Sequence, residues 1–562
     1  MRKILSLVCA FLAFGLTLQA QSVEDALKPV TRTYALTNAT IVTQPGEMIE
    51  GGTIVIKDGL IEAIGTNVSV PAGAKVIAAD SMYVYAGFID ALSNTGVPRP
   101  KEENNGPRRG RRPDGVNPGD PPRDLAGVTP EKQVRGDLKP DERSVEEMRQ
   151  LGYTAAHVVP HGRMLPGQGS VILLAGENGE DMLLSEGVSL FTQFESAPGV
   201  FPATVIGVMS KFDELYRQTQ QMIMHMEAYA KKPRGMDRPE RDEALEALAP
   251  VVKGEKPLFF MAPEVKDIYR VLRMQEDLGF KLVLTGVREA WHVTDQLADK
   301  DIPVIVNLEL PDPPKEKKKE GEDEDEAMDD EMKMLQKRAA ERMQEFEAQA
   351  ATLAEAGIQF GFTAMEAKTN DIRANLRRMI ENGLSEEQAL AALTTNPAAM
   401  LGVSGMMGTL EEGKMGNLLV SDAPYFAEGS NVRFVMVDGH LFEYEAKKAT
   451  KGDPNATANV NGVWSYTVEV PGQTSEGTLN LIDNAGDITG TFYSTQMPSA
   501  EDIENASLDG NELRFDAPVS MGGQTMTLQF TLVINGDTFE GAVSVGEFGT
   551  FDVEGYREGD PE

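Results

Sequence analysis

The fold is decided by residues 256–308, which read KPLFFMAPEVKDIYRVLRMQEDLGFKLVLTGVREAWHVTDQLADKDIPVIVNL. Three short apolar runs, LFFM, LVLTG and IPVIVNL, alternate here with two longer segments in which apolar residues recur at helical spacing. A repeated order of strand and helix with near-continuous apolar strands is typical of a parallel sheet covered by helices. We therefore expect an α/β domain in this part of the chain.

The same alternation extends back to about residue 145, and β-rich flanks enclose it. Residues 155–160 read AAHVVP, and an amphipathic helix is expected over 210–230. The N-terminal flank, residues 33–85, alternates short β-like runs with turns and predicts a small antiparallel sheet. A β pattern returns after residue 400, in NLLVSD and NVRFVMVDGHLFEYE. The α/β domain is therefore expected to lie between two β-rich flanks.

The C-terminal segment has the pattern of a separate all-β domain. It follows a linker near 448–461 and contains about eight short alternating strands between GVWSYTVEV and FDVEGYR. Regular short strands joined by turns such as VINGD predict a small closed barrel or a sandwich.

Two inserts interrupt the middle of the chain. The first, residues 98–124, is rich in Pro, Gly and Arg. The second, 313–345, opens with the charge run PPKEKKKEGEDEDEAMDDEMKM and is expected to become helical only in its second half. We interpret both as solvated inserts, and the alternative is a docking site for an oppositely charged partner.

Residues 1–20 have the plan of a cleavable secretory signal. Arg2 and Lys3 precede an apolar run that ends at Ala20, so the mature chain is expected to begin at Gln21. The run is shorter than the roughly 20 residues of a spanning helix, so we expect no transmembrane anchor after signal removal. The single cysteine, Cys9, lies inside this segment. A mature chain without thiols suits export to a periplasmic or extracellular location.

Length and charge limit the classes of partner. With 562 residues the chain can form two or three domains. A formal net charge of −35 at pH 7 repels polyanions, so neither nucleic acid nor an anionic membrane surface is an expected partner.

Three stretches resemble the amidohydrolase superfamily, in its imidazolonepropionase-like branch. GGTIVIKDGLIEAIG (51–65), followed by YVYAGFID (83–90), is similar to the opening of that family. LTTNPAAMLGVSGMMGTLEEGKMGNLLVSD (393–422) is similar to its closing segment, and EMRQLGYTAAHVVPHGRMLPGQGSVILLAG (147–176) to a segment between them. The resemblance implies a (β/α)8 TIM-type barrel over 86–400 and a composite β-sandwich made of 21–85 and 401–447.

The C-terminal all-β domain, residues 455–558, carries a weaker resemblance. It opens with GVW at 462–464, which is similar to the start of lipocalin-like and avidin-like small β-barrels. A buried Trp464 that closes one end of any small barrel would explain the same residues.

The superfamily resemblance also implies one or two divalent metals at the C-terminal mouth of the barrel. The positions of its usual histidine and aspartate ligands are occupied here by Leu92, Asn94, Met261, Thr285 and Ala364. Zinc and similar ions prefer imidazole and carboxylate ligands, which none of these residues supplies. We therefore expect that the catalytic metal site is lost and that no cofactor is bound.

Other residues could rebuild a site. His157 and His161 are the alternative metal ligands, for zinc or another divalent ion, and their spacing puts them on one face of a strand unless Pro160 ends that strand between them. Asp90 and Glu264 are the candidate carboxylates for acid–base catalysis without a metal, and Asp267 and Glu366 are also expected near the mouth. In the structural alternative, Asp90 fixes a turn and the others are solvated.

Two functions follow from these observations. We favour an exported, noncatalytic member of the superfamily that binds a small molecule or serves as the partner subunit of an intact amidohydrolase homologue. The alternative is a hydrolase that acts on a non-peptide carbon–nitrogen bond, such as a cyclic amide, with a rearranged or metal-free site.

Overall fold

The computed structural model describes residues 33–100, 115–311, 330–444 and most of 456–558. In the last segment the described residues are 456, 458–470, 473–484, 486–495, 500–521, 524–545 and 550–558. The expected signal at 1–20 and parts of both inserts and of the linker lie outside the described residues. The described residues form three sheets of eight, eight and nine strands.

The central sheet closes into a barrel, in the strand order β13-β12-β11-β10-β9-β8-β7-β6. Its strands are β6 (Phe88–Ser93), β7 (Tyr153–Val158), β8 (Gly167–Leu173), β9 (Leu183–Gln193), β10 (Leu258–Met261), β11 (Leu282–Val287), β12 (Val304–Asn307) and β13 (Phe360–Thr363). The first and last strands, β6 and β13, lie side by side. The three runs that open the sequence analysis are the neighbouring parallel strands β10, β11 and β12.

Strand β8 runs against both of its neighbours, so the expectation of an all-parallel barrel is wrong at this strand. A parallel connection needs a crossover of a dozen or more residues. Only residues 159–166 join β7 to β8, and residues 174–182, with the short α4, join β8 to β9. The chain must therefore turn back in two hairpins, and the sequence PHGRMLPG between the first pair carries the turn residues for this.

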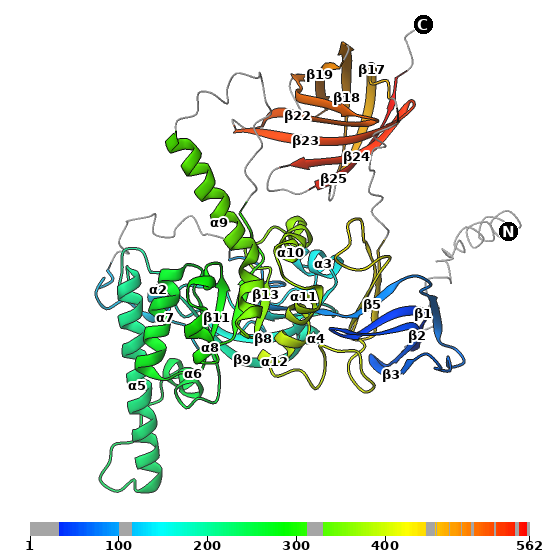
Figure 1. Cartoon of the computed structure of the whole chain (residues 1–562). Coiled ribbons are helices and arrows are strands. Elements are labelled where there is room, and N and C mark those ends of the chain that lie inside the picture. Colours follow the sequence, from blue (N-terminus) through cyan, green and yellow to red (C-terminus); the bar gives the residue numbers. More distant parts are fainter. Residues whose placement is uncertain are drawn as a thin grey trace, which may run out of the picture.

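Helices cover the outside of the barrel, as the strand and helix alternation predicts (Figure 1). They are α2 (Arg123–Ala126), α3 (Arg143–Gln150), α4 (Gly179–Met182), α5 (Val205–Lys231), α6 (Glu243–Val252), α7 (Val265–Leu278), α8 (Thr294–Asp299), α9 (Asp330–Glu355), α10 (Ile372–Glu381), α11 (Glu386–Leu393) and α12 (Thr395–Met400), with 3-10 turns η1 (Ala290–His292) and η2 (Thr369–Asp371). In α7, Ile268, Val271 and Leu272 form the buried stripe, and Gly279 ends the helix at a φ of 78°.

The two flanks form one sheet beside the barrel, in the order β16-β15-β14-β5-β1-β2-β3, with β4 paired to β1. Its strands are β1 (Thr33–Gln44), β2 (Glu47–Lys57), β3 (Leu60–Gly65), β4 (Lys75–Ala78), β5 (Tyr83–Ala86), β14 (Leu418–Ser421), β15 (Val432–Val437) and β16 (His440–Glu443). β5 joins the flanks by pairing with β1 and β14. β1 runs parallel to β4 and β5, so the expected purely antiparallel sheet is wrong there.

The C-terminal sheet is entirely antiparallel and nearly closed. Its nine strands are β17 (Gly462–Val470), β18 (Gln473–Asn484), β19 (Asp487–Ser494), β20 (Glu501–Asp502), β21 (Glu504–Asp509), β22 (Glu512–Met521), β23 (Gln524–Asn535), β24 (Thr538–Val545) and β25 (Thr550–Arg557). The consecutive strands β20 and β21 pair with opposite ends of the sheet, which brings those ends together. Trp464 is fully buried, and its indole N–H donates to the carbonyl oxygen of Val460 at 2.9 Å. It is thus a core aromatic.

Among the described residues, no helix is long and apolar enough to cross a membrane.

Gly87 links the flank sheet to the barrel, because it lies between β5 and β6 and donates its N–H to the carbonyl oxygen of Asn417. A Cβ at this position would lie 2.2 Å from the side chain of the buried Thr154. We expect Gly87→Ala to lower the free energy of unfolding by about 1–3 kcal/mol through overpacking. Urea unfolding would measure this. Gly405→Ala is the control, since a Cβ there meets nothing within 4 Å, and an equal loss in both variants would contradict the packing argument.

Candidate functional site

The C-terminal ends of the parallel strands form the mouth of the barrel. Leu92 and Asp90 lie on β6, Met261 ends β10, Thr285 lies in β11 and Ala364 directly follows β13. Leu92, Asp90 and Thr285 are completely buried. The expected ligand positions therefore do gather on strands that converge at one end of one barrel.

The side chains at these positions do not suit a divalent metal. Leu92 belongs to the barrel core, and Met261 packs on Gly286, where a Cβ would lie 3.0 Å from its Cε. The amide of Asn94 is engaged, since its Nδ2 donates to the carbonyl oxygen of Val159 at 2.7 Å. Within the described part of the chain, no three His, Cys, Asp or Glu side chains are grouped so that they could hold a metal ion.

Asp90 instead joins the first strand of the barrel to the last. Its Oδ1 accepts hydrogen bonds from the backbone N–H of Leu92 and of Ala364, both at 3.3 Å. The hydroxyl of Thr363 also donates to the carbonyl oxygen of Leu92. Burial raises the pKa of Asp90 to about 7, although the hydrogen bonds from the N–H groups of Leu92 and Ala364 partly oppose the rise. Its Oδ2 has no hydrogen-bond partner among the described residues.

The pKa of Asp90 makes a prediction about stability. A rise from 3.8 in the unfolded chain to about 7 in the folded protein corresponds to roughly 4 kcal/mol. The protonated form is the one that burial favours, so this contribution is lost as the pH rises from about 4 to about 7. Asp90→Asn keeps an acceptor oxygen without the proton.

The measurement is the free energy of unfolding of both proteins between pH 4 and 8. We expect the advantage of wild type over Asp90→Asn to fall by a few kcal/mol from pH 4 to 7 and then to level off. A difference that does not change with pH would show that Asp90 titrates normally.

His157 is buried with both ring nitrogens engaged. Its Nδ1 lies 3.0 Å from the carbonyl oxygen of Ala91, which can only accept, so Nδ1 carries the proton. Burial lowers the pKa of His157 to about 4, so the ring is neutral and Nε2 accepts from the hydroxyl of Ser189 at 2.8 Å. The reversed strand β8 places Gly169 here, where a Cβ would lie 2.1 Å from Nε2.

The hydrogen bond between Ser189 and His157 is enclosed in the protein core. Ser189 and His157 are both fully buried, and Phe259 packs edge-on to the imidazole with ring centres 4.6 Å apart. Neither nitrogen of His157 is free to ligate a metal without breaking one of its hydrogen bonds.

The remaining sequence candidates have other partners. Nε2 of His161 lies 3.0 Å from the carbonyl oxygen of Val97. Glu264 precedes α7 and forms an ion pair with Lys266 at the surface. Asp267 pairs with Arg270 at 2.5 Å.

A site that the sequence reasoning missed lies to one side of the mouth. A cavity of about 320 Å³ opens where β11, β12 and β13 end, between the segments that follow those strands and helices α9 and α10. Its charged lining residues are Arg288, Glu309, Lys368 and Asp371, and its apolar ones are Leu310, Pro311 and Phe346. Arg288 directly follows β11, and this position after a strand was the only feature of the sequence that could have indicated the cavity.

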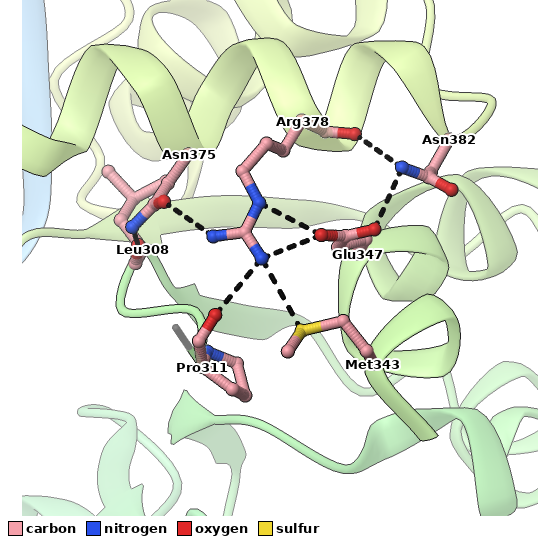
Figure 2. Close-up of polar contacts among 7 residues, drawn as sticks. All are labelled: Leu308, Pro311, Met343, Glu347, Asn375, Arg378 and Asn382. Atoms are coloured by element: carbon pink, nitrogen blue, oxygen red, sulfur yellow. Dashed lines mark hydrogen bonds and ion pairs between the residues drawn. The ribbon is translucent and has the colours of Figure 1, made fainter. Parts of the chain in front are cut away.

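The wall of this cavity is held by a polar network around Arg378 (Figure 2). The guanidinium donates to Glu347 of α9 at 2.8 and 2.6 Å, to the carbonyl oxygen of Pro311 and to Asn375. Asn375 in turn donates to the carbonyl oxygen of Leu308. The network thus fixes α9, α10 and the segment after β12 relative to one another.

Glu347 tests the strength of this network. Its side chain is 16% exposed and that of Arg378 is 20% exposed. Glu347→Gln removes the charge and points an NH₂ group toward donors, so we expect a loss of about 2 kcal/mol in the free energy of unfolding. Glu341→Gln on the same helix is the matched control, because its ion pair with Lys337 spans 3.8 Å at the surface.

Chemical denaturation at pH 7 would compare the two variants. The control is expected to change stability by less than about 0.5 kcal/mol. Equal small effects would mean that the network does not stabilise this wall.

Comparison with known proteins agrees with this architecture. Residues 322–442 match the model of the Amidohydrolase family. An amidohydrolase structure from Thermotoga maritima MSB8 aligns with a TM-score of 0.58 at 22% identity, covering 73% of this chain and all of that one. A putative prolidase from Bifidobacterium longum aligns with a TM-score of only 0.39 at 17% identity, covering 74% of this chain and 95% of that one.

Residues 322–442 are thus similar to the Amidohydrolase family, and the chain shares its fold with the amidohydrolase structure from Thermotoga maritima MSB8. No protein of curated function matches it in sequence.

Proposed function

We propose that this protein is an exported, noncatalytic member of the amidohydrolase superfamily, which binds a small molecule or serves as the partner subunit of an intact homologue. The observation that carries this proposal is the filling of the barrel centre. Leu92 is buried at the mouth, and both nitrogens of His157 are hydrogen-bonded.

The energetics support a barrel adapted to the absence of a metal. A buried cluster of empty imidazoles and carboxylates would be costly to desolvate, whereas Leu92 and Met261 contribute apolar packing. The one buried carboxyl among the former candidates, Asp90, has a raised pKa and bridges two strands. Such a barrel keeps a rigid frame for binding while it lacks the group that would activate water.

The alternative is a hydrolase for non-peptide carbon–nitrogen bonds with a metal-free or rearranged site. It is favoured by one observation, the pair of buried groups Asp90 Oδ2 and Tyr153 OH, neither of which has a hydrogen-bond partner among the described residues. Burial raises the pKa of Tyr153, and the nearby Asp90 adds to that rise. A carboxylic acid with a pKa of about 7 could exchange protons at neutral pH.

The domain boundaries belong to the same proposal. We propose that 21–85 and 401–447 support the barrel of 86–400 and that the C-terminal barrel, 455–558, is a lipocalin-like second binding surface. The buried Trp464 near the start of that barrel is compatible with this assignment.

Metal content tests the proposal most directly. Protein that begins at Gln21 would be dialysed against zinc or manganese and analysed by plasma mass spectrometry. We expect well under one equivalent of retained metal, because the described residues of the mouth offer no group of imidazoles and carboxylates that could hold an ion.

Near-stoichiometric, tightly held metal would overturn the proposal, and His157→Gln and His161→Gln would then show whether these residues hold it. Hydrolysis of amide or cyclic amide substrates by metal-free protein, lost in Asp90→Asn, would favour the alternative instead.

A further inference from the structure

The cavity beside the mouth has a balanced set of charges. Arg288 and Lys368 are its cations, and Glu309 and Asp371 are its anions. Arg288 is held between two carboxylates, because its Nη2 pairs with Glu309 and lies 2.9 Å from Glu366. The lining therefore carries no net charge, although the whole chain carries −35.

Two of these charges remain available to a ligand. The ammonium group of Lys368 and the carboxylate of Asp371 form no ion pair with another residue that the structure describes. The two residues lie three apart around η2 (Thr369–Asp371), at the rim of the cavity. An exposed ammonium group and an exposed carboxylate among the lining residues of one small cavity complement a molecule that bears both a carboxylate and an ammonium group.

Three of the lining residues are apolar: Leu310, Pro311 and Phe346. Phe346 packs edge-on against Trp291 with ring centres 5.1 Å apart, and the guanidinium of Arg342 lies 5.5 Å from the centre of the Phe346 ring. Leu310 is buried in the hydrophobic core. The Arg378 network anchors the neighbouring Pro311 (Figure 2). An apolar group of a ligand would find a preformed surface here.

We propose that this cavity binds a free α-amino acid with an apolar side chain. The carboxylate would pair with Lys368 and the ammonium group with Asp371, while the side chain lies against Phe346 and Leu310. The volume of about 320 Å³ is at the small end of ligand sites, which suits a single amino acid. The inference rests on the proposed binding function and names its ligand class.

The test is isothermal titration of the mature chain with L-leucine, leucinamide and N-acetyl-leucine. Leucinamide lacks the carboxylate, and N-acetyl-leucine lacks the ammonium group. We expect L-leucine to bind more tightly than either analogue. Lys368→Gln and Asp371→Asn are each expected to weaken L-leucine binding about two- to fivefold, the scale of an exposed charge pair.

The charge pairing adds a sharper expectation. Lys368→Gln should leave the affinity for leucinamide unchanged, and Asp371→Asn should leave that for N-acetyl-leucine unchanged. Lys300→Gln and Asp299→Asn are the matched controls, because these exposed residues precede β12 at the opposite end of the barrel. Both controls should bind L-leucine as wild type does.

No L-leucine binding by folded wild-type protein at millimolar concentration would overturn the inference, as would binding that is indifferent to Lys368 and Asp371. Either result leaves the metal content and hydrolysis assays untouched, so the noncatalytic proposal would stand or fall separately. Conversely, metal retention with intact leucine binding would overturn only the noncatalytic proposal.

Discussion

The closure of the barrel depends on the contact between its first and last strands. β6 and β13 lie side by side, and the carboxyl of Asp90 bridges them through the N–H groups of Leu92 and Ala364. Because this carboxyl is completely buried, its protonated form is stabilised, and the seam has a neutral hydrogen-bonding group at its centre at mildly acid pH.

The reversed strand β8 determines what fills the barrel. It places Gly169 beside the hydrogen bond between His157 and Ser189, where there is no room for a side chain. His157 is therefore a neutral residue of the core, and its ring nitrogens are not free to bind a metal. The barrel centre is packed around this histidine, and the cavity lined by Arg288, Glu309 and the segment after β13 lies to one side of the mouth.

Several features could be predicted from the sequence, because they depend on local periodicity. The strand runs β10, β11 and β12, the helix α5 and the all-β C-terminal segment all appear where the patterns place them. Two strand directions were not predicted. β8 and the parallel pairing of β1 with β5 depend on which strands meet in space, and alternation along a strand looks the same in either direction.

Some features of the candidate site could likewise be predicted from the sequence, and others could not. Residue types alone showed that Leu92 and Ala364 have no donor atom for a metal and that Met261 offers only a thioether, a poor ligand for zinc. Only the tertiary structure decided the state of His157 and the existence of the cavity lined by Arg288, Phe346 and Lys368. These residues come from separate elements, and burial, pKa and enclosure arise from neighbours that the fold brings together across long stretches of chain.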